Sequence, residues 1–134
     1  MKNIHKLAAI DIGSNAVRLL ITSIRINKPD TKFKKISLVR VPLRLGEDVF
    51  SKGKISDKKL ERLQKTLKAF KILMQMHEVY MFKAVATSAM REAENSTKII
   101  EDIFKKLNIK IDLISGKKEA LMICLLYTSD AADE

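Results

Sequence analysis

The sequence has little of what secreted or membrane proteins use. A single cysteine, Cys124, excludes an internal disulfide framework. No apolar run reaches the ~18 residues that a membrane span needs. The short apolar stretch near the N-terminus is interrupted by Asp11, and no small-residue cleavage site follows it. We therefore expect a cytoplasmic protein with no signal peptide and no membrane partner.

Aromatic residues are also scarce, at 5% of 134 residues, with two Tyr and no Trp. Base-stacking platforms are thus poorly supplied, and we expect no specific nucleic-acid partner. The formal net charge is +10, mostly from Lys, which favours polyanions in general. A solvated, Lys-rich surface is the other explanation of this charge. The hydrophobic content of 46% is enough for one domain with a core.

The first third of the chain alternates apolar and polar residues. This pattern predicts strands over residues 7–11, 16–26 and 33–43. Only the turn DIGSN (Asp11–Asn15) separates the first two strands, which predicts a hairpin. Pro42 lacks an N–H and should mark the end of the third strand or an edge. The expected product is an antiparallel meander.

The rest of the chain alternates helices and strands. Residues 44–56 contain two glycines and are predicted to be a loop, after which Ser56 caps a helix. An apolar stripe at three- and four-residue spacing predicts the buried face of that helix: Leu60, Leu63, Leu67, Phe70 and Met74.

A strand is expected over residues 79–86, then a helix capped by Asn95 or Ser96, a strand over residues 109–115 and a helix from Gly116. The predicted order is βββαβαβα. Helices between the later strands imply parallel pairing, and the fold class is α/β.

Three short segments stand at predicted strand ends, where open α/β sheets bind ligands. The first is DIGSN. Gly13 permits a turn that brings backbone N–H groups close to a ligand, and Ser14 and Asn15 add side-chain donors. Asp11 is an acid suited to a metal ion or a water molecule. Small polar residues also form ordinary hairpin turns, so these residues alone leave both interpretations open.

The other two segments are ATSAMREA and ISGKKEA. Thr87 and Ser88 stand where a strand gives way to a helix, whose N-terminus attracts anions. Arg91 opposes the helix dipole unless a phosphate binds there, or it is an exposed side chain that reaches past the helix end. Glu119 stabilises the dipole of the next helix or orients water for hydrolysis. His5 and His77 have no metal-ligand spacing, and Cys124 has no partner His.

Together these segments carry a family resemblance. AAIDIGSNAVRLLI, RLGEDVFSKGKIS, VATSAMREAEN and IDLISGKKEALMI resemble, in order and spacing, the N-terminal half of the exopolyphosphatase/guanosine pentaphosphate phosphatase (Ppx/GppA) family. The resemblance covers about residues 7–123. It implies an actin-like ATPase (ribonuclease H-like) fold in a two-lobed enzyme. It also implies Mg²⁺-dependent hydrolysis of the terminal phosphoanhydride of inorganic polyphosphate or guanosine pentaphosphate, and a homodimer is compatible with it.

The resemblance assigns roles to the residues above. Asp11 would face the metal ion or the attacking water, and the phosphate would be held by Gly13, Ser14 and Asn15 on one side and by Thr87, Ser88 and Arg91 on the other. Glu119 matches the second Glu of the family's G-x-E-E-A motif and would activate the water. Lys118 stands where the family has its first Glu, which changes the local charge.

The end of the sequence departs from the family. All Lys and Arg lie at or before Lys118, and the last eleven residues, CLLYTSDAADE, contain three acids and no base. The family's second glycine-rich loop, of the D-x-G-G-G-S type, does not occur, and the tail resembles read-through of a sequencing-library adapter. We expect a domain over residues 1–123, truncated and inactive by itself, and a non-native tail over residues 124–134. The alternative function is a non-catalytic basic module that binds polyanions or nucleic acid.

Overall fold

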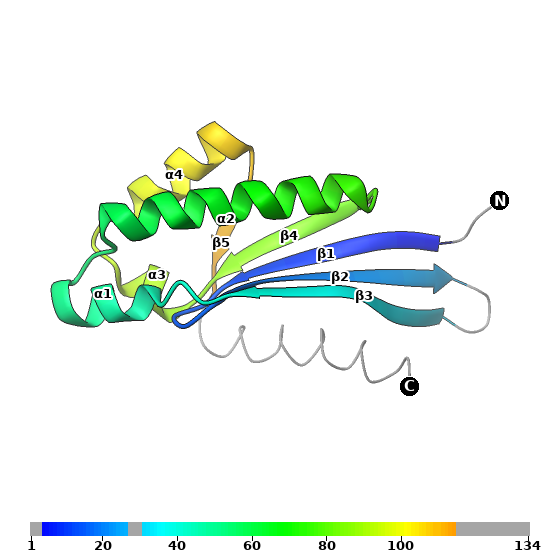
Figure 1. Cartoon of the computed structure of the whole chain (residues 1–134), viewed down its shortest axis with the longest axis horizontal. Helices are drawn as coiled ribbons and strands as arrows, with labels where there is room; N and C mark the ends of the chain where they lie inside the picture. The colour runs from blue at the N-terminus through cyan, green and yellow to red at the C-terminus, as the bar shows by residue number, and fades with distance from the viewer. Residues whose placement is uncertain (1–3, 27–30, 115–134) are drawn as a thin grey trace.

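The computed structural model describes residues 4–26 and 31–114. Figure 1 shows a sheet with helices gathered on one face and at one end. The elements in chain order are β1 (Ile4–Ile12), β2 (Val17–Ile26), β3 (Thr31–Val41), α1 (Leu45–Lys52), α2 (Asp57–Met76), β4 (Met81–Ala86), α3 (Ser88–Glu92), α4 (Ser96–Leu107) and β5 (Ile111–Leu113). The helix expected from Gly116 lies outside the described residues.

The five strands form one mixed sheet in the order β3-β2-β1-β4-β5. The predicted meander is confirmed: β1 pairs antiparallel with β2, and β2 with β3. Pro42 follows directly after β3, as expected of a residue that ends a strand. β4 pairs parallel with β1, and β5 parallel with β4, which confirms the parallel half of the predicted α/β sheet.

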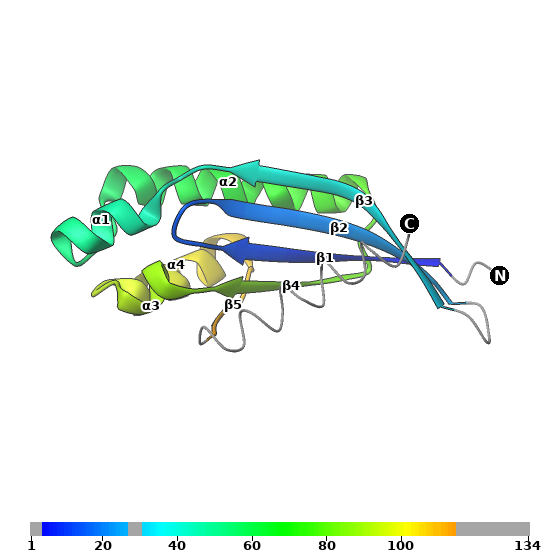
Figure 2. The ribbon, with the colours of Figure 1, turned by 90° about the horizontal axis from the view of Figure 1, so that it is seen from below.

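Helices α2 and α4 cover one face of this sheet (Figures 1 and 2). Ile10 and Leu19 are register partners on that face and are fully buried. The predicted stripe of α2 packs in the same core, with Leu63, Leu67 and Phe70 at most 1% exposed. Ser56 caps α2 as predicted, because its hydroxyl accepts a hydrogen bond from the Lys59 N–H at 3.4 Å.

The prediction of a loop over residues 44–56 is wrong for most of its length, because Leu45–Lys52 form helix α1. The helix depends on tertiary contacts: Leu45 is fully buried and Val49, one turn later, is 6% exposed. Arg44 enters the helix with φ 53°, and Gly53 ends it with φ 77°. Gly46 marks a close packing contact, since a Cβ there would stand 3.1 Å from the Ser14 Cβ, and Gly53 marks the helix end.

The chain between β4 and β5 forms two helices, where one was expected. Asn95 occupies the N-cap position of α4, but its side chain does not cap that helix. Instead its amide pairs with the backbone of Ile55, accepting from the N–H at 3.2 Å and donating to the carbonyl at 3.0 Å. This pairing ties the start of α4 to the segment between α1 and α2.

Candidate functional site

The turn between β1 and β2 forms the centre of the candidate site. The Gly13 N–H donates to the Ala16 carbonyl at 3.0 Å and closes the turn. A Cβ added at Gly13 would stand 3.0 Å from that same oxygen, so the turn would have to shift slightly to accept a side chain there. Gly13 thus permits a close backbone approach.

The N-terminus of α1 holds this turn from outside. The Gly46 N–H donates to the Ser14 carbonyl and the Arg44 N–H to the Asn15 carbonyl, both at 2.9 Å. In a trans peptide the C=O and the following N–H point in opposite directions. The N–H groups of Asn15 and Ala16 are therefore directed away from α1.

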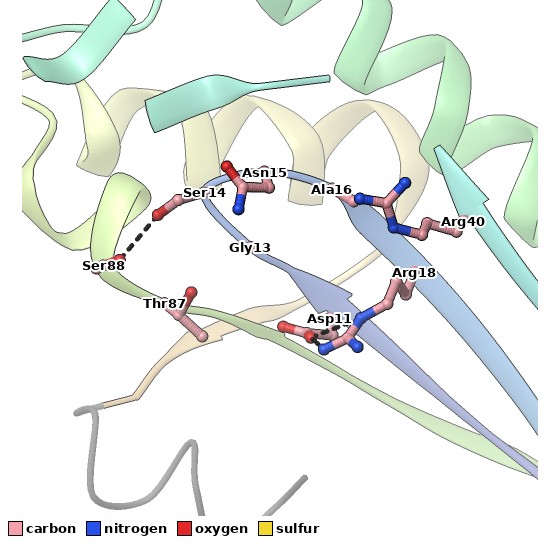
Figure 3. A pocket seen from close by; sticks show the side chains of 9 residues that line it. All are labelled: Asp11, Gly13, Ser14, Asn15, Ala16, Arg18, Arg40, Thr87 and Ser88. Atoms are coloured by element: carbon pink, nitrogen blue, oxygen red, sulfur yellow. Dashed lines mark hydrogen bonds and ion pairs between the residues drawn. The ribbon is translucent and has the colours of Figure 1, made fainter. Parts of the chain in front are cut away.

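The start of α3 meets the same turn. The Thr87 N–H donates to the Ile12 carbonyl at 3.2 Å, and the Ser14 and Ser88 hydroxyls share a hydrogen bond of 2.8 Å. Thr87 is 1% exposed. Ser14 and Asn15 are thus brought together with Thr87 and Ser88, a pair more than seventy residues later in the sequence. The two pairs form two sides of one site (Figure 3).

A cavity of about 400 Å³ opens between these two segments. Backbone N–H groups, hydroxyls and guanidinium groups around it suit an anion. Figure 3 shows its lining, which consists of Asp11, Gly13, Ser14, Asn15, Ala16, Arg18, Arg40, Thr87 and Ser88.

Asp11 lies in the wall of this cavity at 7% exposure. Its Oδ2 accepts hydrogen bonds from the Arg18 guanidinium, one of them from Nε at 3.2 Å. Its Oδ1 is buried and accepts no hydrogen bond from the described residues. A buried carboxylate oxygen with no donor is available to a cation or a water molecule, so Asp11 fits the predicted metal ligand.

A metal ion would need further ligands. No cluster of three or more His, Cys, Asp or Glu occurs within residues 4–26 and 31–114. Mg²⁺ is commonly held by one or two carboxylates together with waters and substrate phosphates, so a single Asp next to an anion site is compatible with it.

Two arginines of the lining were missed by the sequence analysis. Asp11 and Arg18 are register partners across β1 and β2, and Arg18 and Arg40 across β2 and β3. Directly paired residues share a face of the sheet, so the three side chains form a row on the face opposite α2. The alternation along each strand gave a signal, but the row follows only from the register.

Arg91 and Glu119 complete the predicted set. Arg91 does not line the cavity; its Nη1 donates to the Ile114 carbonyl at 2.8 Å, at the end of β5. Its predicted contact with phosphate stays a prediction. Glu119 lies outside the described residues, so its convergence with Asp11 and Asn15 also stays a prediction.

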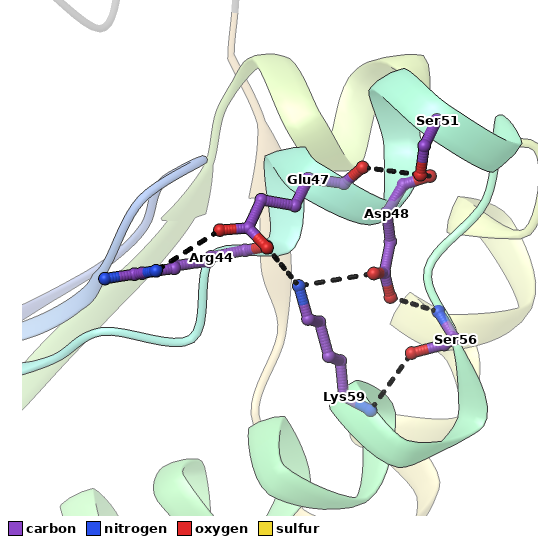
Figure 4. Close-up of polar contacts among 6 residues, drawn as sticks. All are labelled: Arg44, Glu47, Asp48, Ser51, Ser56 and Lys59. Carbon is purple, nitrogen blue, oxygen red and sulfur yellow. Dashed lines mark hydrogen bonds and ion pairs between the residues drawn. The ribbon is translucent and has the colours of Figure 1, made fainter.

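A network of polar contacts fixes α1 on α2 (Figure 4). The Lys59 ammonium donates to the Arg44 carbonyl at 2.6 Å and pairs with Asp48 at 3.2 Å. The Ser56 N–H donates to Asp48 at 2.9 Å. Hydrogen bonding from Ser56 and then the charge of Lys59 outweigh partial burial and lower the Asp48 pKa from 3.8 to about 2. This network supports the helix end that holds the turn.

Comparison with known proteins identifies the fold and the family. The architecture is that of the actin-like ATPase fold, as in a crystal structure of the Ppx/GppA family member of Aquifex aeolicus: TM-score 0.81 and 29% identity, over 92% of this chain and 40% of that one. An exopolyphosphatase structure from Cytophaga hutchinsonii gives a TM-score of 0.78 and 31% identity, over 88% and 36% of the two chains. The Ppx/GppA phosphatase family model matches residues 24–132, and the chain belongs to this family.

Curated relatives are longer than this chain. The bifunctional 3-dehydroquinate synthase/phosphatase of Fusobacterium nucleatum is 34% identical over 122 residues, which are 89% of this chain and 18% of the relative. Exopolyphosphatase 1 of Mycobacterium tuberculosis is 29% identical over 120 residues, which are 90% and 34%. The chain thus spans about a third of the second protein and less than a fifth of the first. No helix among the described residues is long and apolar enough to cross a membrane.

Proposed function

We propose that this chain contributes the first phosphate-binding half of an enzyme that hydrolyses terminal phosphoanhydride bonds of inorganic polyphosphate or guanosine pentaphosphate. The observation that carries the proposal is the cavity at the β1–β2 turn, where a turn held from outside by α1 meets the start of α3. Membership of the Ppx/GppA family and the likeness to exopolyphosphatases support it.

The terminal phosphate would bind between the turn and α3. The N–H groups of Asn15 and Ala16 point away from α1, and the Ser14 and Ser88 hydroxyls meet at 2.8 Å. A phosphate oxygen would replace that hydroxyl contact or accept from both groups. Because the backbone donors are already fixed, little reorganisation is needed on binding.

Asp11 would hold the metal ion through its Oδ1, which accepts no hydrogen bond from the part of the chain that the structure describes. Mg²⁺, when bound, supplies positive charge that offsets the charge of the phosphate groups. Arg18 keeps Oδ2 occupied, which orients the carboxylate so that Oδ1 remains available. Arg18 thus acts on the metal site through Asp11.

The chemical step would be attack of a water oxygen on the terminal phosphorus. The bond between this phosphorus and the bridging oxygen breaks, and the bridging oxygen leaves with its electron pair on the shortened chain. The proton of the water passes to Glu119, the general base implied by the family resemblance. Arg91 is proposed to contact the phosphate from the side of α3.

For the isolated 134-residue chain we propose salt-sensitive polyphosphate binding without hydrolysis. The net charge of +10 supplies the attraction. Hydrolysis requires phosphate gripped from both sides, and the chain spans only 40% of its structural relative from Aquifex aeolicus. A non-catalytic basic module would show the same binding but would have no use for Asp11 and Glu119.

The test uses phosphate release from polyphosphate or guanosine pentaphosphate with Mg²⁺. In an enzyme extended to the length of its relatives, Glu119→Gln should lower turnover by about 10²–10⁴-fold, because the general base is lost while the shape is kept. Glu101→Gln, on α4, is the matched control and should leave turnover unchanged. Wild-type turnover in Glu119→Gln would remove Glu119 from the mechanism, and an extended enzyme without hydrolysis would favour the binding module.

A further inference from the structure

Arg40 lines the cavity, but the proposed terminal-phosphate site assigns it no role. It lies on β3 near its end, is exposed, and lines the cavity together with Arg18. Within residues 4–26 and 31–114 it makes no ion pair. Its side chain extends from β3 toward the β1–β2 turn in Figure 3. A guanidinium that faces a cavity without a carboxylate partner can bind an anion.

The register makes the charge at this position costly in the absence of a ligand. Arg18 and Arg40 are directly paired across β2 and β3, on one face of the sheet. Like charges in this arrangement destabilise a sheet. Arg18 is compensated by Asp11, whereas Arg40 pairs with no carboxylate of the residues that the structure describes. The row Asp11, Arg18 and Arg40 therefore carries one excess positive charge, at the end formed by Arg40.

The size of the cavity indicates more than one phosphate group. About 400 Å³ lies within the range of sites that hold whole small molecules, and a single phosphate would not fill it. Adjacent strands are about 4.8 Å apart, so the backbone of Arg40 is roughly 10 Å from that of Asp11. An anion at Arg40 is thus distinct from one at the β1–β2 turn, but both open into the same cavity.

We propose that Arg40 binds a second phosphate group of a linear phosphate chain whose terminal phosphate lies at the β1–β2 turn. This inference rests on the proposed function and adds the path of the substrate: the chain crosses the outer face of β2 toward β3. The ligand class is an oligophosphate, either free or as the phosphate chain of a nucleotide. Arg40 would favour condensed phosphates over orthophosphate.

The test compares ligands of different length on the complete 134-residue chain. Orthophosphate, tripolyphosphate and guanosine triphosphate are titrated at fixed low ionic strength, and the amide resonances of Ser14, Asn15 and Ser88 are followed by NMR. Arg40→Gln should weaken tripolyphosphate binding about 10-fold, the loss of one charge-assisted contact, and leave orthophosphate affinity within about 2-fold. Arg40→Lys should recover part of the tripolyphosphate affinity.

Arg25→Gln is the matched control. Arg25 is also exposed, lies on β2 toward the other end of the sheet and does not line the cavity. Removal of the same charge there should change tripolyphosphate affinity by no more than about 2-fold. Circular dichroism spectra that match the wild type establish that both variants fold.

The outcomes separate this inference from the proposed function. Equal weakening of tripolyphosphate binding by Arg40→Gln and Arg25→Gln, or equal losses for orthophosphate and tripolyphosphate, would mean that Arg40 acts only through the net charge of the protein. Either result would overturn this inference and leave the proposed function standing. Unchanged turn resonances with every ligand would overturn the phosphate site itself. A loss for tripolyphosphate alone assigns a free phosphate chain to Arg40, and equal losses for tripolyphosphate and guanosine triphosphate extend the site to the phosphate chain of a nucleotide. An unchanged tripolyphosphate affinity would overturn the inference.

Discussion

The two sides of the cavity are built by different means. On one side the β1–β2 turn is fixed through its backbone, by Gly13, by the first N–H groups of α1 and by the contact of Ser14 with Ser88. On the other side Asp11, Arg18 and Arg40 form a row of charged side chains on the face of the sheet opposite α2. The first side supplies fixed donors, and the second supplies charge.

Because one side uses backbone donors and the other uses charged side chains, different residues are needed to keep each side in place. The donors of the turn depend on the steric fit of Gly46, a residue that does not line the cavity. The charged row depends on the ionisation of its own members. Substitutions that change volume should therefore damage the turn, and substitutions that change charge at constant volume should damage the row.

The largest effect is expected from Gly46→Val. A Cβ at Gly46 would stand 3.1 Å from the Ser14 Cβ and 3.4 Å from the Ser14 carbonyl oxygen. The larger side chain must push the turn away from α1, at a cost of about 3 kcal/mol in stability, and the amides of the turn lose their alignment. Urea unfolding and tripolyphosphate titration measure the two losses.

Ser14→Gly provides the control for this prediction, because it removes the Cβ atom that the new side chain would meet. In the double variant Gly46→Val with Ser14→Gly, the stability loss should be smaller than the sum of the single losses. Strictly additive losses would mean that Gly46 and Ser14 do not oppose each other, and the role of α1 in holding the turn would be wrong.

A smaller effect is expected from Asp11→Asn, which keeps volume and removes charge. Arg18 loses its carboxylate partner, which should cost about 2 kcal/mol. Mg²⁺ should strengthen tripolyphosphate binding in the wild type and leave it unchanged in the variant. Asp112→Asn on β5, outside the cavity lining, is the control and should keep the Mg²⁺ effect. A Mg²⁺ effect that survives Asp11→Asn would exclude Asp11 as a metal ligand.

The sequence predicted those features that depend on neighbouring residues. The β1–β2 hairpin follows from two apolar runs around a short polar turn, and the cap of α2 follows from Ser56 directly before the apolar stripe. Helix α1 did not follow. Its glycines indicated a loop, while the burial of Leu45 and Val49 against the core, which stabilises the helix, is a tertiary effect.

Part of the cavity lining was predictable from the sequence. Ser14, Asn15, Thr87 and Ser88 were predicted as phosphate-binding residues because small polar residues at strand ends are a local signal, and the structure places them around one cavity. Arg18 and Arg40 were missed because each lies within a strand, where a charge alternating with apolar residues suggests ordinary exposure. Only the register across three strands puts them beside Asp11.

The smallest effect in this comparison is expected from Asp48→Asn, which weakens the support of the turn from a distance. Asp48 accepts from the Ser56 N–H and pairs with Lys59, which also donates to the Arg44 carbonyl at the start of α1. A carboxyl pKa lowered from 3.8 to about 2 means that the ionised form stabilises the fold. This contribution is complete above pH 4 and is lost as the pH falls toward 2.

The size follows from the shift. It corresponds to at most about 2.5 kcal/mol, which solvent screening near the surface reduces to about 1–2 kcal/mol. At pH 7 the variant should be less stable by this amount, and the deficit should disappear by about pH 2 in urea unfolding measured across the range. Asp102→Asn, on α4, removes the same charge and should change stability by less than about 0.5 kcal/mol. A deficit in Asp48→Asn that stays constant down to pH 2 would show that Asp48 supports α1 by its shape and not by its charge. The position of the turn would then depend on packing alone, both at Gly46 and at Asp48.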